Sequence, residues 1–244
     1  MARLPNLGLD AYTRRARLQP ALLVLLPLLL AYGAWFPQHA RLEMLPFAGV
    51  IYLVLSGLLA QVARDRGRRL EPELIRRWGG LPTTQLLRHR NKSVNPTTRE
   101  RHHARLAALM PDIRLPSAAE ELGQPEAADQ TYDACVARLR EHTRAREEFP
   151  LVFEENANYG YRRNVWAMRP LGLSLAALGL ATTIALAIGQ VRTTGAASGL
   201  SIATSALNAL LLALWVIQFS DGWVRIAAEA YARQLLAACE RLKE

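Results

Sequence analysis

Cysteine is scarce in this sequence of 244 residues, which holds only Cys135 and Cys239. Neither cysteine has a second metal-ligating residue nearby, so one chain can build neither a disulfide framework nor a zinc motif from them. Two isolated thiols of this kind are typical of packing residues in a reducing compartment.

Catalytic and phosphate-binding motifs are also missing. The sequence has no Gly-x-x-x-x-Gly-Lys loop, no His-Glu-x-x-His pair and no Gly-x-Ser-x-Gly elbow. His89, His102 and His103 stand among arginines, which disfavour both a divalent cation and a protonated imidazole. We therefore expect no catalytic residue, no metal and no cofactor, and we expect that the chain is not an enzyme.

Charge is nearly absent from two stretches, 20–62 and 170–219, although the mean hydropathy of the whole chain is close to zero. Each stretch contains two apolar runs of a length that crosses about 30 Å of hydrocarbon. The runs are Pro20 to Pro37, Met44 to Ala63, Pro170 to Val191 and Gly199 to Phe219. They predict four transmembrane helices in two hairpins.

The first run allows a second interpretation, because three arginines precede it as in a secretory signal. No small-x-small cleavage site closes this run, and another apolar run follows after a short link. A first transmembrane helix is the preferred interpretation.

The distribution of lysine and arginine predicts the orientation. The amino-terminal tail has four, the segment between the hairpins twenty and the carboxyl-terminal tail four, whereas each hairpin tip has one. Because positively charged segments stay inside, both termini and the central segment are expected to be cytoplasmic.

The predicted fold is thus an all-α membrane protein with a helical cytoplasmic domain between two hairpins. The expected segments are a cytoplasmic tail at 1–19, a hairpin at 20–63, a basic domain at 64–169, a hairpin at 170–219 and a carboxyl-terminal cytoplasmic helix at 220–244.

Proline, glycine and capping residues divide the central domain into helices. Pro72 is expected to open a short helix that ends at Trp78, before the turn at Gly79-Gly80. Asn95 and Pro96 predict a helix start, and Ser117 with Glu120 has the spacing of a capping box. Further helices are expected from Pro125 to Arg146 and from Leu151 into the third span.

The central domain also contains a cluster of cations that suits a phosphate. Between Arg64 and Arg114 there are 13 basic and 5 acidic residues, against 4 and 10 between Leu115 and Tyr161. Such a split can serve anionic lipid, a nucleotide ligand or pairing between the two halves of the domain. Free N–H groups at a helix start beside cations favour an anion, and nearby aromatic rings can stack on bases. The candidate ligand residues are Arg88, His89, Arg90, Lys92, Arg99, Arg101, Arg105, Tyr159, Tyr161, Arg162 and Arg163. Anionic lipid is the alternative partner, favoured for the arginines next to the spans.

Polar residues recur on one face of the fourth span, at Ser201, Thr204, Ser205 and Asn208. This stripe either packs helices together or lines a pore in an oligomer. In the third span, Ala177, Ala181, Ala185 and Gly189 predict a face of close helix approach. No span centre carries a charge, which disfavours a proton-coupled carrier.

The carboxyl-terminal tail has apolar residues at alternating spacings of four and three, from Val224 to Leu242. This pattern fits either a coiled coil between copies of the chain or a helix docked on the central domain of its own chain.

Two segments carry a resemblance to known proteins. RWGGLPTTQLLR at Arg77 to Arg88 and FEENANYGYRRN at Phe153 to Asn164 look like a bacterial family of four-span membrane proteins. The paired spans around a basic cytoplasmic domain are also similar in layout and charge to the Hailong channel effectors of anti-phage defence.

That resemblance implies a homotetrameric ion channel in the bacterial inner membrane. The channel would be held shut by a short oligodeoxyadenylate, which a partner nucleotidyltransferase makes. The expected function is an oligomeric channel gated by a single-stranded oligonucleotide or cyclic nucleotide. The alternative is a membrane-anchored scaffold that recruits a partner to the inner face of the membrane.

Overall fold

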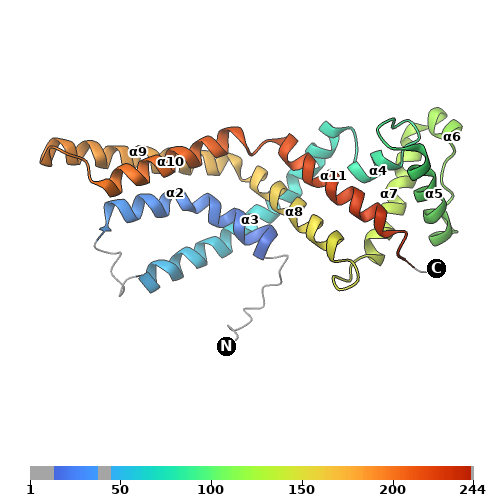
Figure 1. Cartoon of the computed structure of the whole chain (residues 1–244), viewed down its shortest axis with the longest axis horizontal. Coiled ribbons are helices and arrows are strands. Elements are labelled where there is room, and N and C mark those ends of the chain that lie inside the picture. The colour runs from blue at the N-terminus through green and yellow to red at the C-terminus, as the bar shows by residue number, and fades with distance from the viewer. Residues whose placement is uncertain (1–13, 38–44, 243–244) are drawn as a thin grey trace. The chain divides into compact units, whose positions relative to one another are not determined.

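The computed structural model describes residues 14–37 and 45–242, and every regular element in these ranges is a helix (Figure 1). The chain divides into two compact units. The membrane unit comprises residues 1–71 and 160–224, and the soluble unit comprises residues 72–159 and 225–244. The expected all-helical architecture is confirmed for the described residues.

Three helices of the membrane unit are long and apolar enough to cross a membrane. They correspond to Arg15–Trp35, Arg169–Thr194 and Gly199–Ile217. The first begins in a π-helical turn, Arg14–Leu18, and continues as α2, Gln19–Trp35, while the other two are α9 and α10. Three membrane-competent helices make the chain a multi-pass membrane protein.

The predicted second span, Met44 to Ala63, begins outside the described residues. Its remainder forms the first part of α3, Leu45–Trp78. The side chains of Val50, Ile51, Val54 and Leu58 are all more than half exposed on this helix. A fourth span at this position remains a prediction.

The membrane unit is packed through small residues. Gly172, Ala176, Gly179 and Thr183 form the buried face of α9. A Cβ atom at Gly179 would lie only 2.9 Å from the carbonyl oxygen of Pro27 on α2. The sequence predicted a different close-approach face, at Ala177, Ala181, Ala185 and Gly189. That prediction was wrong, since all four residues are exposed. Spacing alone could not select between two small-residue faces of the same helix.

Helix α3 contacts α2 along a narrow face. The hydroxyl of Tyr52 donates a hydrogen bond to the carbonyl oxygen of Leu22 at 2.9 Å. Ser56, Ala60 and Ala63 are buried on the same side of α3. The two helices thus meet through the Tyr52 hydrogen bond and a row of short side chains.

Within the described residues, the soluble unit contains four whole helices, most of a fifth and parts of two others. The whole helices are α4 (Pro82–Leu87), α5 (Pro96–Leu109), α6 (Ala118–Gly123) and α7 (Pro125–His142). Most of α11 (Asp221–Ala238) belongs to the unit, with the first part of α8 (Pro150–Ala167) and the end of α3. The two predicted caps are confirmed. Asn95 accepts from the backbone N–H of Thr97, and Ser117 with Glu120 forms a complete capping box.

Two predicted helix boundaries were wrong. Pro72 does not open a helix but lies inside α3, which runs without a break to Trp78. Pro72 is exposed to solvent. Water can therefore bind the backbone carbonyl four residues earlier, which has no N–H donor because proline lacks one. Helix α7 ends at His142 rather than Arg146. Just after this end, the Thr143 hydroxyl donates a hydrogen bond to the carbonyl oxygen of Leu139.

The carboxyl-terminal helix α11 docks on its own soluble unit. Leu235 and Leu236 are fully buried in one core with Leu106, Tyr132 and Leu139. Of the two interpretations of the heptad-like spacing, intramolecular docking is the arrangement that the structure shows. The apolar face of α11 is therefore buried within its own chain.

The close contact at Gly179 can be tested by adding one methyl group. Gly179→Ala is expected to destabilise the membrane unit by about 1–3 kcal/mol, because the new Cβ would meet the backbone of Pro27. The measurement is thermal unfolding in detergent. Gly189→Ala on the same helix is the matched control, since nothing lies within 4 Å of a Cβ there. Equal unfolding temperatures for the two variants would contradict the packing described here.

Candidate functional site

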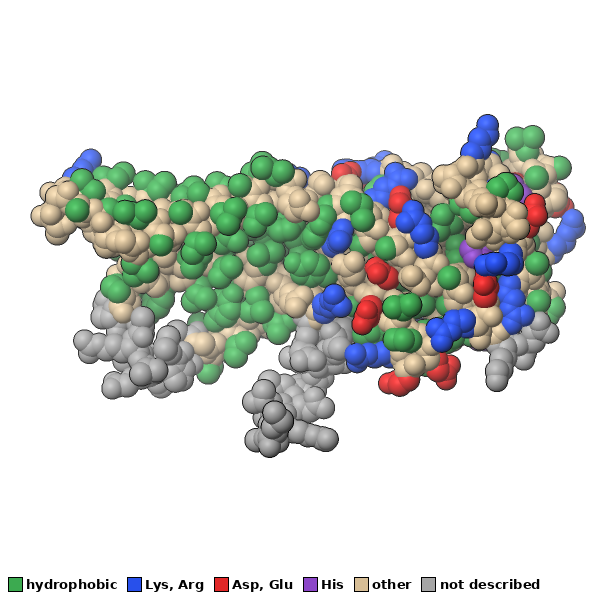
Figure 2. Space-filling model, in the orientation of Figure 1, with side chains coloured by type: hydrophobic (Ala, Val, Ile, Leu, Met, Phe, Trp, Pro, Cys, Tyr) green, Lys and Arg blue, Asp and Glu red, His purple; other side chains and the backbone are tan. Residues whose placement is uncertain are grey.

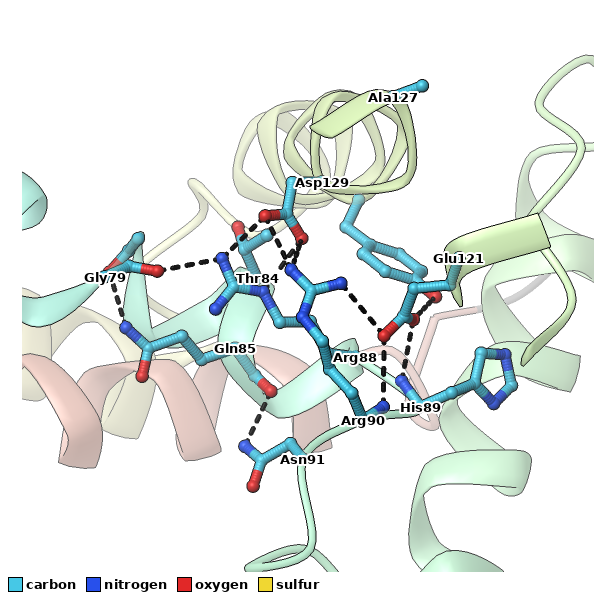
Figure 3. A network of polar contacts seen from close by, with 12 residues as sticks. Gly79, Thr84, Gln85, Arg88, His89, Arg90, Asn91, Glu121, Ala127 and Asp129 are labelled. Atoms are coloured by element: carbon cyan, nitrogen blue, oxygen red, sulfur yellow. Dashed lines mark hydrogen bonds and ion pairs between the residues drawn. The ribbon is translucent and has the colours of Figure 1, made fainter. Parts of the chain in front are cut away.

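Four charged side chains form the centre of the predicted anion site, and they pair with one another (Figure 3). Arg88 donates to Asp129 through Nε at 2.8 Å and Nη2 at 2.7 Å. Arg90 donates to both oxygens of Asp129 at 2.9 Å and to Glu121 at 3.0 Å. Two guanidinium groups and two carboxylates thus compensate each other, in the bidentate geometry that arginine favours.

Glu121 is the most buried member of this network, with 1% of its surface exposed. It accepts from the backbone N–H groups of His89 and Arg90 at 2.8 and 3.0 Å and from the Tyr132 hydroxyl at 2.7 Å. Burial acts to raise the pKa of Glu121, but these hydrogen bonds and the Arg90 charge outweigh it and lower the pKa. Glu121 therefore stays ionised and holds the segment 88–90 against α6.

The Gly79-Gly80 turn gives Arg88 its place. Both glycines have positive φ, 78° and 125°, which a residue with a Cβ rarely adopts. The Arg88 Nη2 donates to the carbonyl oxygen of Gly79 at 2.9 Å, and a Cβ at Gly80 would lie 2.5 Å from the same nitrogen. The motif RWGGLPTTQLLR thus has a structural explanation, in which its glycines accommodate its last arginine.

Histidines 89 and 103 lie beside the network. Their rings meet edge to face at 4.7 Å, and each Nε2 lies near a backbone carbonyl, that of Pro116 for His89 and that of Leu87 for His103. Burial lowers the pKa of His103 and of His102, which keeps both rings neutral near pH 7. No group of three potential metal ligands occurs among the described residues.

The other candidate cations of the soluble unit have different surroundings. Arg101 pairs with Glu240 at 2.6 Å, and Arg105 donates to the carbonyls of Cys239 and Leu242. These two contacts fasten the end of α11 to α5. Arg99 donates to the carbonyl of Asn91 at 3.2 Å, while Lys92 is exposed and has no hydrogen bond or ion pair within the described parts of the chain.

The aromatic and arginine residues predicted near the third span fall in different units. Tyr159 belongs to the soluble unit, where its ring stacks on Tyr231 at 6.4 Å. Tyr161, Arg162 and Arg163 belong to the membrane unit. There Tyr161 meets the Trp223 ring edge to face, Arg162 lies over that ring at 4.9 Å and Arg163 pairs with Glu71 at 2.8 Å.

The excess positive charge of the chain lies in the membrane unit. The soluble unit has 17 basic and 16 acidic side chains, whereas the membrane unit has 13 and 5. Charged and apolar side chains separate visibly on the surface in Figure 2. The soluble unit is therefore close to neutral, whereas the domain predicted from the sequence, at 64–169, was basic.

The polar stripe of α10 lies inside the membrane unit. Ser201 and Asn208 are fully buried, Thr204 is 5% exposed and Ser205 is half-buried. The hydroxyls of Thr204 and Ser205 donate to backbone carbonyls of their own helix, and Ser201 donates to the Gln190 side chain at 2.8 Å. This burial places the stripe against helices of its own chain, and whether it also lines a pathway for solutes remains a prediction.

Asn208 is the exception within the stripe. Neither its amide nitrogen nor its amide oxygen has a hydrogen-bond partner among the described residues. The indole nitrogen of Trp215, two turns further along α10, is also buried without a partner. The sequence pattern identified Asn208 but gave no sign that its amide is unpaired.

Comparisons with protein-family models, curated proteins and solved structures give no match for this chain.

The charge network predicts the effect of one uncharged substitution. Glu121→Gln is expected to lower the free energy of unfolding of the soluble unit by about 3 kcal/mol, because the buried NH₂ group of glutamine would face N–H and O–H donors that the Glu121 carboxylate accepts. Urea unfolding followed by tryptophan fluorescence measures the change. The control is Glu141→Gln, which removes an exposed pair with Arg144 and is expected to cost about 0.5 kcal/mol or less. Similar losses for both variants would show that the network is not a structural centre.

Proposed function

We propose that the chain is an oligomeric membrane channel with four spans, the second of which is the apolar part of α3. The observation that carries this proposal is the polar row inside the membrane unit, which ends in an unpaired amide at the centre of a span. Helix packing alone needs small or satisfied polar residues, and an unsatisfied amide in hydrocarbon is costly. A pathway for polar solutes accounts for it.

The same helix offers a closure for this pathway. After Asn208 the buried face of α10 continues with Leu211 and Trp215. Trp215 is fully buried, and a Cβ at Gly172 would lie 2.4 Å from its ring. A large ring in tight contact with a neighbouring helix would keep the channel shut in the described conformation.

The orientation follows from the arginines of the membrane unit. Arg64, Arg66, Arg68 and Arg69 continue the apolar part of α3, and Arg169 donates to the carbonyls of Trp215 and Val216 at the end of α10. A row of arginines at span ends favours anionic lipid on the cytoplasmic side. We place both termini and the soluble unit there, at the bacterial inner membrane.

The proposed signal is an anionic nucleotide or oligonucleotide. A role in anti-phage defence, gated by an anionic nucleotide or oligonucleotide from a partner nucleotidyltransferase, rests on the resemblance in layout and motifs. Arg88 and Arg90 are paired with carboxylates, and Arg101 is paired with Glu240, so the cations proposed for a phosphate are Lys92 and Arg99, on α5 and the turn before it.

A specific observation favours the alternative function, a membrane-anchored scaffold. The soluble unit is nearly neutral and its central arginines are compensated within the chain, as in a folded interaction domain rather than an electrostatic trap for nucleic acid. In this alternative the spans only hold the domain at the membrane.

Planar-bilayer recording distinguishes the two functions. The purified chain is expected to conduct ions, and Asn208→Leu is expected to change the single-channel current because it removes the polar group at the middle of the pathway. Leu210→Ala is the control, since Leu210 is 57% exposed on the opposite, apolar side of α10. No conductance from a correctly folded chain, with and without a nucleotide, would favour the scaffold.

Oligonucleotide binding tests the signal separately. If Lys92 and Arg99 contact phosphates of a single strand, Lys92→Gln with Arg99→Gln is expected to reduce the slope of log affinity against log salt by about 1.4, from about 0.7 per contact. Arg140→Gln is the matched control, because Arg140 is exposed on α7, outside the proposed site. Fluorescence polarisation with a labelled oligodeoxyadenylate measures both. An unchanged slope would exclude these two residues as the phosphate site.

A further inference from the structure

Three helices of the membrane unit cross near the middle of their lengths. Pro27 is the central residue of α2, Asn208 is the central residue of α10, and Gly179 lies close to the centre of α9. A Cβ at Gly179 would lie 2.9 Å from the Pro27 carbonyl oxygen and 3.2 Å from the Asn208 Oδ1. At about 1.5 Å rise per residue, this crossing lies about 14 Å from either end of α10, near the midplane of a bilayer.

The crossing is rich in hydrogen-bond acceptors. Thr183 and Thr204 follow and precede it by about one helical turn and are both buried. Their hydroxyls donate to the backbone of their own helices, to Gly179 at 3.0 Å and to Leu200 at 2.8 Å. With their protons used in this way, the two hydroxyls can only accept.

The backbone of α2 adds a further acceptor. Pro27 has no N–H, so the carbonyl of Leu23 lacks its usual helical donor. Asn208 contributes an amide oxygen and an NH₂ group, neither of which has a hydrogen-bond partner among the described residues. The crossing thus offers several acceptors and the two donors of a single NH₂ group, with no acidic or basic side chain among the residues that form it.

We propose that the crossing of Pro27, Gly179 and Asn208 is a hydrated site that binds water at the Asn208 amide. Water supplies the two donors that acceptor-rich surroundings lack, and its oxygen accepts from the Asn208 NH₂ group. This inference rests on the proposed channel, and it locates the narrowest polar point of the pathway within one chain rather than on an axis between copies.

Cysteine accessibility in membrane vesicles tests the site while leaving Asn208 in place. Thr204→Cys is expected to react with 2-aminoethyl methanethiosulfonate about tenfold or more faster than Leu207→Cys, because a thiol ionises and reacts only where water reaches it. Leu207 is 47% exposed on the apolar side of α10. The unsubstituted chain gives the background, since Cys135 and Cys239 are fully buried.

A second substitution assigns the water to Asn208. Thr204→Cys combined with Asn208→Leu is expected to react as slowly as Leu207→Cys, because leucine leaves no group to hold water. Equal rates for Thr204→Cys with and without Asn208→Leu would overturn the assignment, and an unreactive Thr204→Cys would overturn the hydrated site.

Thermal unfolding in detergent tests whether water binds at Asn208 even if a cysteine variant does not fold correctly. A hydrated Asn208 keeps its hydrogen bonds, so Asn208→Leu is expected to lower the unfolding temperature or leave it unchanged. A dry, unpaired amide would instead make Asn208→Leu stabilising, and a higher unfolding temperature would overturn the site.

Reactive Thr204→Cys without conductance would reject the channel and keep the hydrated site, whereas conductance with an unreactive Thr204→Cys would place the pathway elsewhere.

Discussion

The exclusion of water from hydrocarbon is the constraint on which the membrane unit depends. Because polar groups cannot be solvated there, Ser201, Thr204 and Asn208 turn toward α2 and α9, while Leu207 and Leu210 face outward. The same constraint explains why hydroxyls in α9 and α10 bond their own backbone. Gly179 then allows α2 to approach within contact of this polar row.

A related rule organises the soluble unit, where buried charge has to be compensated. Glu121 and Asp129 neutralise Arg88 and Arg90, and Glu121 also caps two backbone N–H groups. This network joins the turn after α4 to α6 and α7. Arg88 and Arg90, which the sequence suggested as ligand residues, therefore hold helices of the soluble unit together. The excess of basic over acidic residues lies in the membrane unit instead.

Much of the secondary structure was predictable because its causes are local. The Asn95 cap and the Ser117–Glu120 capping box depend on residues within one helical turn. Pro72 was misjudged because a proline inside a helix is tolerated when its side faces solvent, which depends on burial. The buried face of α9 was also misjudged, since two rows of small residues compete and only the neighbouring helices choose between them.

The sequence by itself determined that this is a multi-pass, all-helical membrane protein, because apolar length and the absence of charge are properties of a segment alone. It also determined which residues are polar within α10. Only the tertiary structure decided that the polar row faces inward, that α11 docks on its own soluble unit and that Arg88 and Arg90 meet carboxylates about 40 and 30 residues away in the chain. Those outcomes depend on contacts between distant segments, and a local pattern carries no information about the partner.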